Sequence, residues 1–382
     1  MYNTLKRLYF KLVFWKNRYF PVHNILRIEP VSKLDYDTFY GYYTEYPVFD
    51  DKIIYHSTKR SCRPLDLKNE VSIVFQNLLS GNVKVIGKST CFNFQQGSRL
   101  RWEENFIFYN AKNKLTDENI VVRYDSVNDV SEQFKGHFCE LISKSIFLSF
   151  DYDYLTSIGS EYGYIGNDSK DSFSDSMQNI CLVDVDKGLS TELLNFVSLK
   201  HNFRELNLSN FHVNHILLNP SRNSFVGILR GYMRKKRLDI LFKFCLISNT
   251  FMILQKGYIS HYTWKDDRTL IYYGNNDKKR GYFSLDVKSN KATKLPINTK
   301  GDGHMSIFND EMVFDTYPGY NGLHELWIYS FKNKTQKLLG VLPNNGNYYG
   351  RFRCDLHPRI GPQGIFLDSA YTDQRRLYKV LM

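Results

Sequence analysis

The sequence predicts an all-β protein, a seven-bladed β-propeller with four-stranded antiparallel blades, and three observations support this fold. Aromatic residues form 16 % of the chain, with 28 Tyr and 28 Phe, and aromatic side chains are enriched in strands. A hairpin pattern recurs, in which alternating apolar residues flank a short polar turn. The pattern returns at intervals of 43 to 53 residues, which is the length of a four-stranded blade.

Two kinds of hairpin alternate along the chain. The first has an apolar strand, a turn rich in Asn, Asp, Gly or Lys, and a second short strand; its copies begin at Ser72, Val121, Asn179, Leu241, Tyr282 and Leu326. The second precedes most of these copies and begins at Asn214, Ser260, Gly303 and Asp355. Two hairpins supply four strands, so each pair corresponds to one blade.

Counting these pairs gives seven units, which begin near Tyr43, Asn93, Ser145, His215, His261, His304 and His357. The last unit is one strand short. We expect a strand from Ile25 (ILRIEP) to complete it, because closing the ring removes exposed strand edges. Residues 25–382 then form a single propeller domain, preceded by a basic and aromatic segment over residues 1–24. The polar stretch Ser160–Asp175 is predicted to be a long loop.

Composition excludes several classes of protein. With 382 residues, of which 42 % are hydrophobic, the chain can bury a sizeable core and is not globally disordered. Its six cysteines lie far apart without a C-x-x-C pair, which argues against a zinc ribbon and a disulfide scaffold. No apolar stretch is long enough to span a membrane as a helix. The first residues lack a small-residue cleavage site, so we expect no secretory signal and a cytoplasmic location.

The net charge of +12 suits an acidic partner, whether nucleic acid, acidic glycan or anionic membrane surface. The sequence evidence for nucleic-acid binding consists of basic runs such as MRKKR from Met233. This run is best explained as a solvated turn, so we do not expect nucleic acid as a partner. Residues 5–20 alternate basic and bulky apolar side chains. They can form a membrane-peripheral interfacial helix. A segment packed on the outside of the ring is the favoured interpretation, because a helical projection spreads the apolar residues around most of the circumference.

Four histidines share one position in successive blades. They stand at the start of the first strand, at 215, 261, 304 and 357, and we expect them to converge on one mouth of the central channel. Asp315 follows His304 by 11 residues and Asp368 follows His357 by 11, which places each carboxylate beside an imidazole across a hairpin. Such a carboxylate fixes the tautomer of the ring, as general bases and metal ligands both require. The alternative is a set of structural, hydrogen-bonding histidines.

Three of these side chains are candidate metal ligands. Asp355 and His357 are two residues apart on one strand and therefore point to the same face. With His304 from the preceding unit, they can supply three ligands to a divalent metal. The alternative is a hydrogen-bonded polar cluster that holds the blades in register. Nearby positive charge is expected from Arg230, Arg353 and Arg359.

At these positions the sequence resembles oligogalacturonate lyase and its relatives, a family of seven-bladed propellers. The motifs that carry the resemblance are TFYGYYTEYPVF from Thr38, FNFQQGSRLRW from Phe92, SHYTW from Ser260, DGHMS from Asp302 followed by DTYP, and RCDLHPR from Arg353. The likeness runs from about Thr38 to the C-terminus. It is strongest to a branch of the superfamily often encoded among bacterial polysaccharide-assembly genes.

The resemblance implies one divalent metal, usually manganese in the family, held by three His and one Gln. By position, His304 and His357 match metal ligands. The family's Gln-x-x-His-x-His reads Phe352-x-x-Asp355-x-His357 here, so a Phe and an Asp replace two of the four ligands.

The resemblance also implies catalytic roles. His261 matches the base that removes the proton next to the uronate carboxylate, and Arg230 matches the catalytic Arg. His215 joins this catalytic group as the equivalent histidine one blade earlier.

Two functions therefore remain open. A polysaccharide or oligosaccharide lyase would cleave an acidic, uronate-containing glycan by β-elimination, with a His base and a metal or Arg that neutralises the carboxylate. Its substrate contacts would come from Arg353, Arg359, Tyr262, Trp264 and Tyr317. The alternative is a non-catalytic propeller that binds a glycan or protein partner in bacterial polysaccharide biosynthesis. The two replaced ligands favour the binding role, and the retained His/Asp pairs favour chemistry.

Overall fold

The computed structural model describes residues 2–20, 22–32, 35–59, 70–150, 152–165, 178–276, 279–299 and 301–382. Most of the predicted loop Ser160–Asp175 lies outside the described residues. The chain divides into two compact units, one formed by residues 1–102 with 296–382 and the other by residues 103–295.

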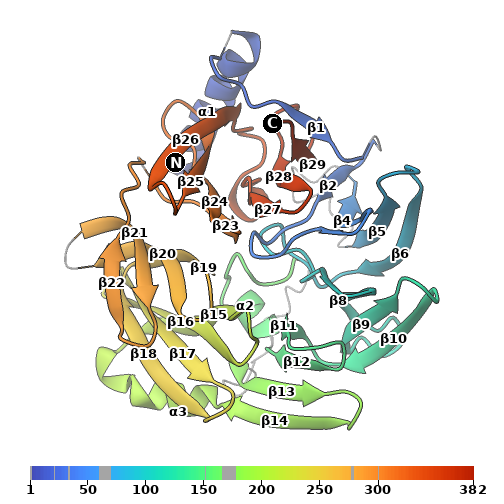
Figure 1. Ribbon diagram of the computed structural model, residues 1–382, viewed down its shortest axis with the longest axis vertical. Helices are drawn as coiled ribbons and strands as arrows, with labels where there is room; N and C mark the ends of the chain where they lie inside the picture. The colour runs from blue at the N-terminus through green and yellow to red at the C-terminus, as the bar shows by residue number, and fades with distance from the viewer. Residues whose placement is uncertain are drawn as a thin grey trace. The chain divides into compact units, whose positions relative to one another are not determined.

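The predicted fold class is confirmed. The described part of the chain is mostly β and forms seven antiparallel sheets of four strands, the blades of a seven-bladed β-propeller (Figure 1). One sheet carries an additional two-residue strand. Each sheet other than the one that contains both ends of the chain is built from strands consecutive in the sequence.

The first unit contains three of these sheets. The first sheet joins β2 (Asp37–Phe39), β4 (Lys52–Thr58), β5 (Val71–Asn77) and β6 (Val83–Ser89), with β3 (Val48–Phe49) paired to β4. The second joins β23 (Met305–Phe308), β24 (Glu311–Asp315), β25 (Leu323–Ser330) and β26 (Thr335–Pro343). The third joins β27 (Arg359–Gly361), β28 (Gly364–Ser369), β29 (Arg376–Val380) and β1 (Ile28–Pro30), and the unit also holds α1 (Tyr2–Tyr19) and the short η4 (Gly350–Phe352).

The second unit contains the other four sheets, the first of which begins at the unit's boundary. The first two sheets are β7 (Arg101–Glu103), β8 (Phe106–Lys112), β9 (Asn119–Asp125) and β10 (Val130–Lys135), and then β11 (Phe138–Leu141), β12 (Ile146–Ser149), β13 (Ile180–Asp184) and β14 (Leu189–Leu194). The third sheet is β15 (Ser209–Leu218), β16 (Ser224–Met233), β17 (Lys236–Cys245) and β18 (Thr250–Gly257). The fourth sheet is β19 (Ile259–Trp264), β20 (Thr269–Asn276), β21 (Lys279–Asp286) and β22 (Lys291–Lys294). Its helices are α2 (Asp153–Ser157), α3 (Phe196–Asn202) and η3 (Arg204–Leu206).

The strand predicted from Ile25 completes the last sheet. β1 pairs antiparallel with β29, with Ile28 opposite Val380, and forms the sheet edge opposite β27. The apolar residues of this sheet and its neighbour meet in one core cluster of the first unit, which includes Val313, Leu326 and Leu367. Burial of this shared core holds the two sheets face to face.

The predicted unit starts near Tyr43 and His215 each lie six residues after the observed starts at Asp37 and Ser209, and two others differ more. The second sheet begins at Arg101 rather than near Asn93, because residues 93–97 form a tight buried loop closed by backbone hydrogen bonds between Asn93 and Gly97. The third begins at Phe138 rather than Ser145, which lies in the turn between β11 and β12. The basic run from Met233 spans the hairpin turn between β16 and β17, with Arg234 and Lys235 in the turn itself.

Candidate functional site

A hairpin of the first unit positions His304 against Asp315. His304 immediately precedes β23, and Asp315 ends the antiparallel strand β24. One carboxylate oxygen of Asp315 accepts the backbone N–H of His304 at 2.6 Å, and the ring Nδ1 lies 3.2 Å from both carboxylate oxygens. The Asp315 carboxylate therefore orients the imidazole, and Nε2 is the nitrogen through which His304 would bind a metal.

Gly303 permits this close approach. A Cβ at this position would collide with the backbone carbonyl and the carboxylate of Asp315. Only glycine lets the chain pass so near the strand that carries the carboxylate. The Gly-His sequence at 303–304 is therefore part of the site's construction.

His357 is held differently. Its Nδ1 lies 3.9 Å from the nearer carboxylate oxygen of Asp368, too far for a hydrogen bond. Asp368 instead accepts the backbone N–H groups of Tyr40 and Gly41, at 2.9 and 3.2 Å, and the Nη2 of Arg359 at 2.6 Å. His357 itself has a left-handed backbone, with φ of 43°, an uncommon conformation for a residue other than glycine and one that clusters at functional sites.

Arg359 is a structural residue, contrary to its predicted role in substrate binding. Its side chain is only 1 % exposed, and its Nε and Nη2 groups donate to the carbonyls of Tyr42 and Gly41 as well as to Asp368. At 1 % exposure the guanidinium is closed off from solvent, although its Nη1 has no hydrogen-bond partner among the described residues. Arg359 therefore fixes Asp368 and the segment at residues 40–42.

Asp355 carries the negative charge of the site. It is 4 % exposed, and the Nε of Arg353 donates to its Oδ2 at 2.5 Å. The Nη2 of the same guanidinium donates to the Oε1 of Gln95 at 2.8 Å. Burial alone raises the pKa of Asp355, but the charge of Arg353, followed by those of His304 and His324, outweighs burial and holds that pKa below its usual value.

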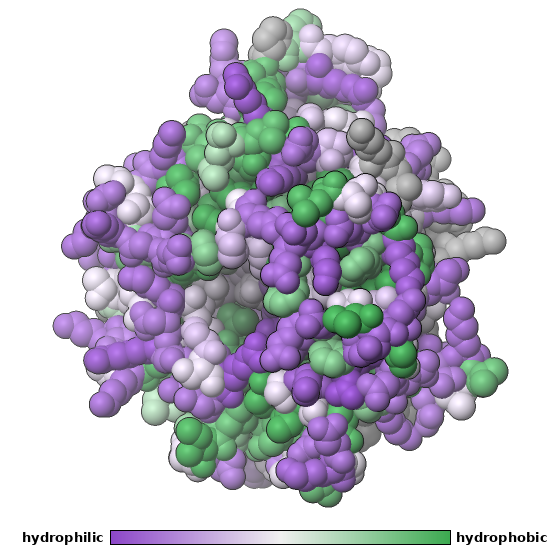
Figure 2. All heavy atoms as spheres, turned by 45° about the vertical axis from the view of Figure 1, so that its right-hand side comes forward, coloured by the Kyte–Doolittle hydropathy of each residue, from purple (hydrophilic) through white to green (hydrophobic). Residues whose placement is uncertain are grey.

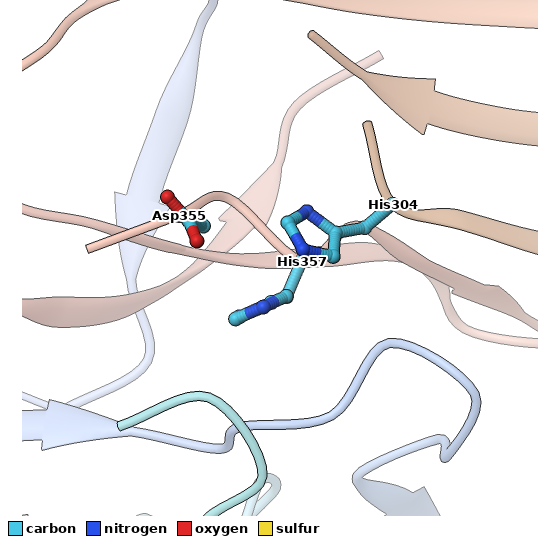
Figure 3. A group of neighbouring side chains, drawn as sticks. All are labelled: His304, Asp355 and His357. Atoms are coloured by element: carbon cyan, nitrogen blue, oxygen red, sulfur yellow. The ribbon is translucent and has the colours of Figure 1, made fainter. Parts of the chain in front are cut away.

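His304, Asp355 and His357 lie together as one group in the structure, which we call the HDH group (Figure 3). One donor atom from each side chain lies within 4.8 Å of the others. The two imidazole rings have centroids 4.1 Å apart, and all three residues are at most 4 % exposed. A metal bound at about 2.1 Å by each donor brings its ligands to about 3–4 Å of one another, so small side-chain rotations suffice to close the group on an ion.

Two tyrosines flank the HDH group. Tyr43 is buried, and its ring centroid lies 5.2 Å from that of His304 and 6.4 Å from that of His357. Tyr317 packs edge-on to His304 at 5.5 Å and is partly exposed. Tyr317 can therefore contact both the metal-ligand candidate and a bound molecule.

The other predicted catalytic residues lie in the second unit. His215 and His261 have ring centroids 6.4 Å apart and are 5 % and 2 % exposed. His215 also has a left-handed backbone, with φ of 53°. The Nε of Arg230 lies 2.7 Å from the carboxylate of Asp239, which also binds Arg237. Asp239 is thus shared by two guanidinium groups, and the Arg230 side chain is only 9 % exposed.

Tyr262 and Trp264 do not present their rings to a ligand, contrary to prediction. They are 1 % and 7 % exposed and belong to a hydrophobic core cluster of the second unit. The Tyr262 hydroxyl donates to the carbonyl of His215, and the Trp264 indole N–H donates to the carbonyl of Leu217. Residues two apart on a strand share a face, and on β19 that face packs against the preceding sheet.

Sequence reasoning assigned no role to Gln95 and Tyr43. Gln95 is 1 % exposed and linked to Asp355 through Arg353. Gln95 belongs to the motif FNFQQGSRLRW, which supported only the resemblance to oligogalacturonate lyases and did not indicate a role for Gln95 itself. Because this motif forms a loop outside the repeated hairpins, strand spacing could not place it beside the HDH group.

Comparisons with known proteins agree on the fold. No protein-family description matches this sequence, and no curated protein is similar to it in sequence. The structure is similar to that of an oligogalacturonate lyase in complex with manganese, with 13 % identity, a TM-score of 0.66 and 95 % of each chain covered. An oligogalacturonate lyase from Vibrio parahaemolyticus gives 11 % identity and a TM-score of 0.63, covering 92 % of this chain and 93 % of that one.

The likeness extends beyond lyases. A prolyl endopeptidase structure covers 98 % of this chain with 11 % identity and a TM-score of 0.54, but this chain spans only 52 % of that protein. At these identities the likeness shows the seven-bladed fold, which hosts many functions. The chemistry of the HDH group therefore has to distinguish among those functions.

The HDH group fits a divalent metal. Two imidazoles and one carboxylate are a ligand set that suits zinc, manganese and iron and leaves coordination positions open. Asp355 is ionised and His304 is oriented by a carboxylate, as ligands to a metal must be. Phe352 packs against Phe94 with ring centroids 5.9 Å apart and supplies no ligand.

Arg353 competes with a metal for Asp355, and this makes its replacement informative. We expect Arg353→Gln to bind Mn²⁺ at least about tenfold more tightly than the parent, a gain of about 1.4 kcal/mol, because the competing cation is removed. Isothermal titration calorimetry measures the change. Arg376→Gln is the matched control, since Arg376 contacts Gln374 and the carbonyl of Ser32 instead. Weaker Mn²⁺ binding by Arg353→Gln would show that Arg353 orients Asp355 rather than competing for it.

Proposed function

We propose that this chain is a carbohydrate-active propeller that cleaves an acidic, uronate-containing glycan by β-elimination. The observation that carries the proposal is the HDH group, a buried cluster of two imidazoles and an ionised carboxylate beside the guanidinium of Arg353. The structural likeness to an oligogalacturonate lyase bound to manganese supports the same class of chemistry.

β-Elimination makes two demands on a protein. A base removes the proton from the carbon next to the uronate carboxylate, and the electron pair forms a double bond as the glycosidic oxygen leaves the neighbouring carbon and takes a proton from water to become a hydroxyl. The proton is weakly acidic unless positive charge stabilises the enolate that develops on the carboxylate. The first unit supplies that charge through Arg353, which is 21 % exposed at its side chain and is held in place by Gln95.

A divalent metal held by His304, Asp355 and His357 would supply further Lewis-acid stabilisation of the carboxylate. The protein's own part is to hold those ligands. Asp315 keeps the His304 ring in one orientation, and the Arg359–Asp368 pair fixes the backbone before Tyr42. Manganese is the metal we propose, by likeness to the lyase complex.

His261 remains the proposed base, with His215 beside it. A neutral imidazole near pH 7 is suited to accepting the proton. Arg230 and Arg353 are both paired with an aspartate, but the Arg230 side chain is 9 % exposed and that of Arg353 is 21 % exposed. Because Arg353 also contacts Asp355 of the HDH group, we assign charge neutralisation to Arg353 rather than Arg230. The acidic glycan is favoured as substrate by the net charge of +12, and Tyr317 is the remaining candidate for stacking on a sugar ring.

The test is product formation from uronate oligosaccharides. The protein with Mn²⁺ should generate the ultraviolet absorbance of an unsaturated uronate together with new reducing ends. His261→Ala should lose at least about 100-fold in kcat, as expected for loss of a general base. The same oligosaccharides with their carboxyl groups reduced should give no product. Tight binding of the uronate oligosaccharides without any product would overturn the lyase proposal.

A non-catalytic binding role is the second candidate, and one observation favours it. Arg353 already neutralises Asp355 in the structure, so the HDH group is a satisfied polar cluster even without an ion. In that case the propeller would bind a glycan or a protein in bacterial polysaccharide biosynthesis. Metal-independent glycan binding that survives His304→Ala would support this role over the lyase.

A further inference from the structure

The outward face of α1 carries an apolar stripe, which we define as Leu5, Leu8, Leu12, Trp15 and Tyr19. These side chains are 55–65 % exposed. Their spacing of three and four residues places them on one face of the helix. Hydrophobic side chains appear among hydrophilic ones at the top of Figure 2, where Figure 1 places α1.

A different face attaches α1 to the first unit. Phe14 is 3 % exposed, the Tyr9 hydroxyl donates to the carbonyl of Tyr320, and the Asn17 amide donates to the carbonyl of Asn321. Arg7 lies over the Tyr349 ring, with 3.9 Å from its guanidinium carbon to the ring centroid. α1 therefore has two apolar faces, one packed on the protein and one exposed. This explains why the apolar residues of the segment are spread around most of the helix circumference.

The charges on α1 are all positive. Its 18 residues contain no Asp or Glu, and its basic residues are Lys6, Arg7, Lys11, Lys16 and Arg18. Arg18 pairs with Asp373, whereas Lys6 and Lys16 are exposed. A helical projection places Lys11 on one side of the apolar stripe and Lys16 on the other.

We propose that α1 lies in the interface of an anionic membrane, with the apolar stripe among the acyl chains and the flanking lysines at the headgroups. The proposal is independent of the proposed lyase activity. A stripe of Leu with Trp and Tyr, flanked by Lys, is the pattern of helices that lie in a membrane surface. In the described residues no helix is long and apolar enough to cross a membrane.

Charge complementarity decides between a lipid surface and a second copy of this chain. Two α1 helices paired through the stripe would bring like charges together, because neither helix has an acidic residue to offer the other's lysines. An anionic lipid surface supplies the missing negative charge, and each nearby Lys strengthens binding to it.

Vesicle binding by the full-length protein tests the proposal. Vesicles of phosphatidylcholine with about 30 mol % phosphatidylglycerol carry the negative surface charge required, and pure phosphatidylcholine vesicles provide the neutral comparison. We expect co-sedimentation with the anionic vesicles only, weakened by added salt. Trp15 is 65 % exposed, so its fluorescence should shift to the blue on binding, and Trp15→Phe should remove that shift.

A matched pair of variants isolates the stripe. Leu8→Gln with Leu12→Gln keeps the helix propensity high and should weaken partitioning at least about tenfold, because two apolar side chains leave the acyl region. Leu115→Gln with Ile247→Gln is the control, since these two residues are 95 % and 79 % exposed elsewhere on the protein. Lys11→Gln with Lys16→Gln should bind weakly and lose most of its sensitivity to salt.

Three outcomes would overturn the proposal. Vesicle binding that is absent, or equal for both lipid compositions, contradicts an anionic interface. Binding that is unchanged in Leu8→Gln with Leu12→Gln places the contact elsewhere. A dimer in light scattering that becomes a monomer in this variant, without vesicle binding by the parent, assigns the stripe to a second copy of the chain.

Discussion

Replacement of His304 by Ala should abolish metal binding by the HDH group. The parent protein is expected to retain close to one divalent ion per chain, measured by plasma mass spectrometry after purification in Mn²⁺. Removing one of three protein ligands should weaken Mn²⁺ binding at least about 100-fold, since even loss of an outer-shell partner costs 10–100-fold. Asp315→Asn changes the carboxylate that contacts the ring and the backbone N–H of His304, and its effect should fall within that smaller range.

A buried histidine outside the HDH group provides the control. His212 is 6 % exposed, lies on β15 of the second unit, and its Nδ1 lies 2.6 Å from the carbonyl oxygen of Asn210. His212→Gln should retain the ion. Equal metal content in His304→Ala and the parent would show that any bound ion lies elsewhere, and the HDH group would then be a structural cluster.

Replacement of Asp368 by Ala should destabilise the protein by about 3–5 kcal/mol, the usual cost of leaving a buried charge without its partner. Asp368 and Arg359 are 2 % and 1 % exposed, so water cannot replace the lost carboxylate. The variant also leaves the backbone N–H groups of Tyr40 and Gly41 without their acceptor. Urea unfolding followed by Trp fluorescence measures the loss in the free energy of unfolding.

Two further variants test the cause of this loss. Arg359→Met combined with Asp368→Ala should cost much less than the two single changes added together, because the unpaired charge is then absent. Glu118→Ala is the control for an ion pair in water: Glu118 and Lys135 are 52 % and 83 % exposed, and no measurable change in stability is expected. Additive losses from the Arg359 and Asp368 changes would show that the pair is not coupled.

The repeated hairpins made the fold predictable, and with it part of the candidate site. His304 and Asp315 stand 11 residues apart at the open end of one hairpin, so strand pairing alone brings them to one place. The same spacing suggested that His357 and Asp368 touch. They do not form a hydrogen bond, because the carboxylate oxygens of Asp368 accept instead from the Arg359 guanidinium and two backbone N–H groups.

Other parts of the site depend on which side of a strand faces the neighbouring sheet. Tyr262 and Trp264 alternate with His261 along β19, and the sequence pattern is the same whether their face packs inside or lies open. Gln95 reaches Asp355 through a loop and an arginine. Loop conformation follows from local turn chemistry and packing, which strand periodicity does not contain.

The sheet that contains β1 and β29 sets the order in which the protein can be assembled on the ribosome. The Thr38 hydroxyl accepts the backbone N–H of Leu377, 339 positions later in the chain. In the same way, β1 can pair with β29 only after β29 has been synthesised. Residues 103–295 are synthesised in between and form a compact unit of their own. Asp355 and His357 directly precede β27, β28 and β29 in the chain, so a nascent chain that stops short of them has neither these three strands nor two of the three HDH side chains. Pairing of β1 and completion of the candidate site thus both require the same segment of the chain, from Asp355 to Val380.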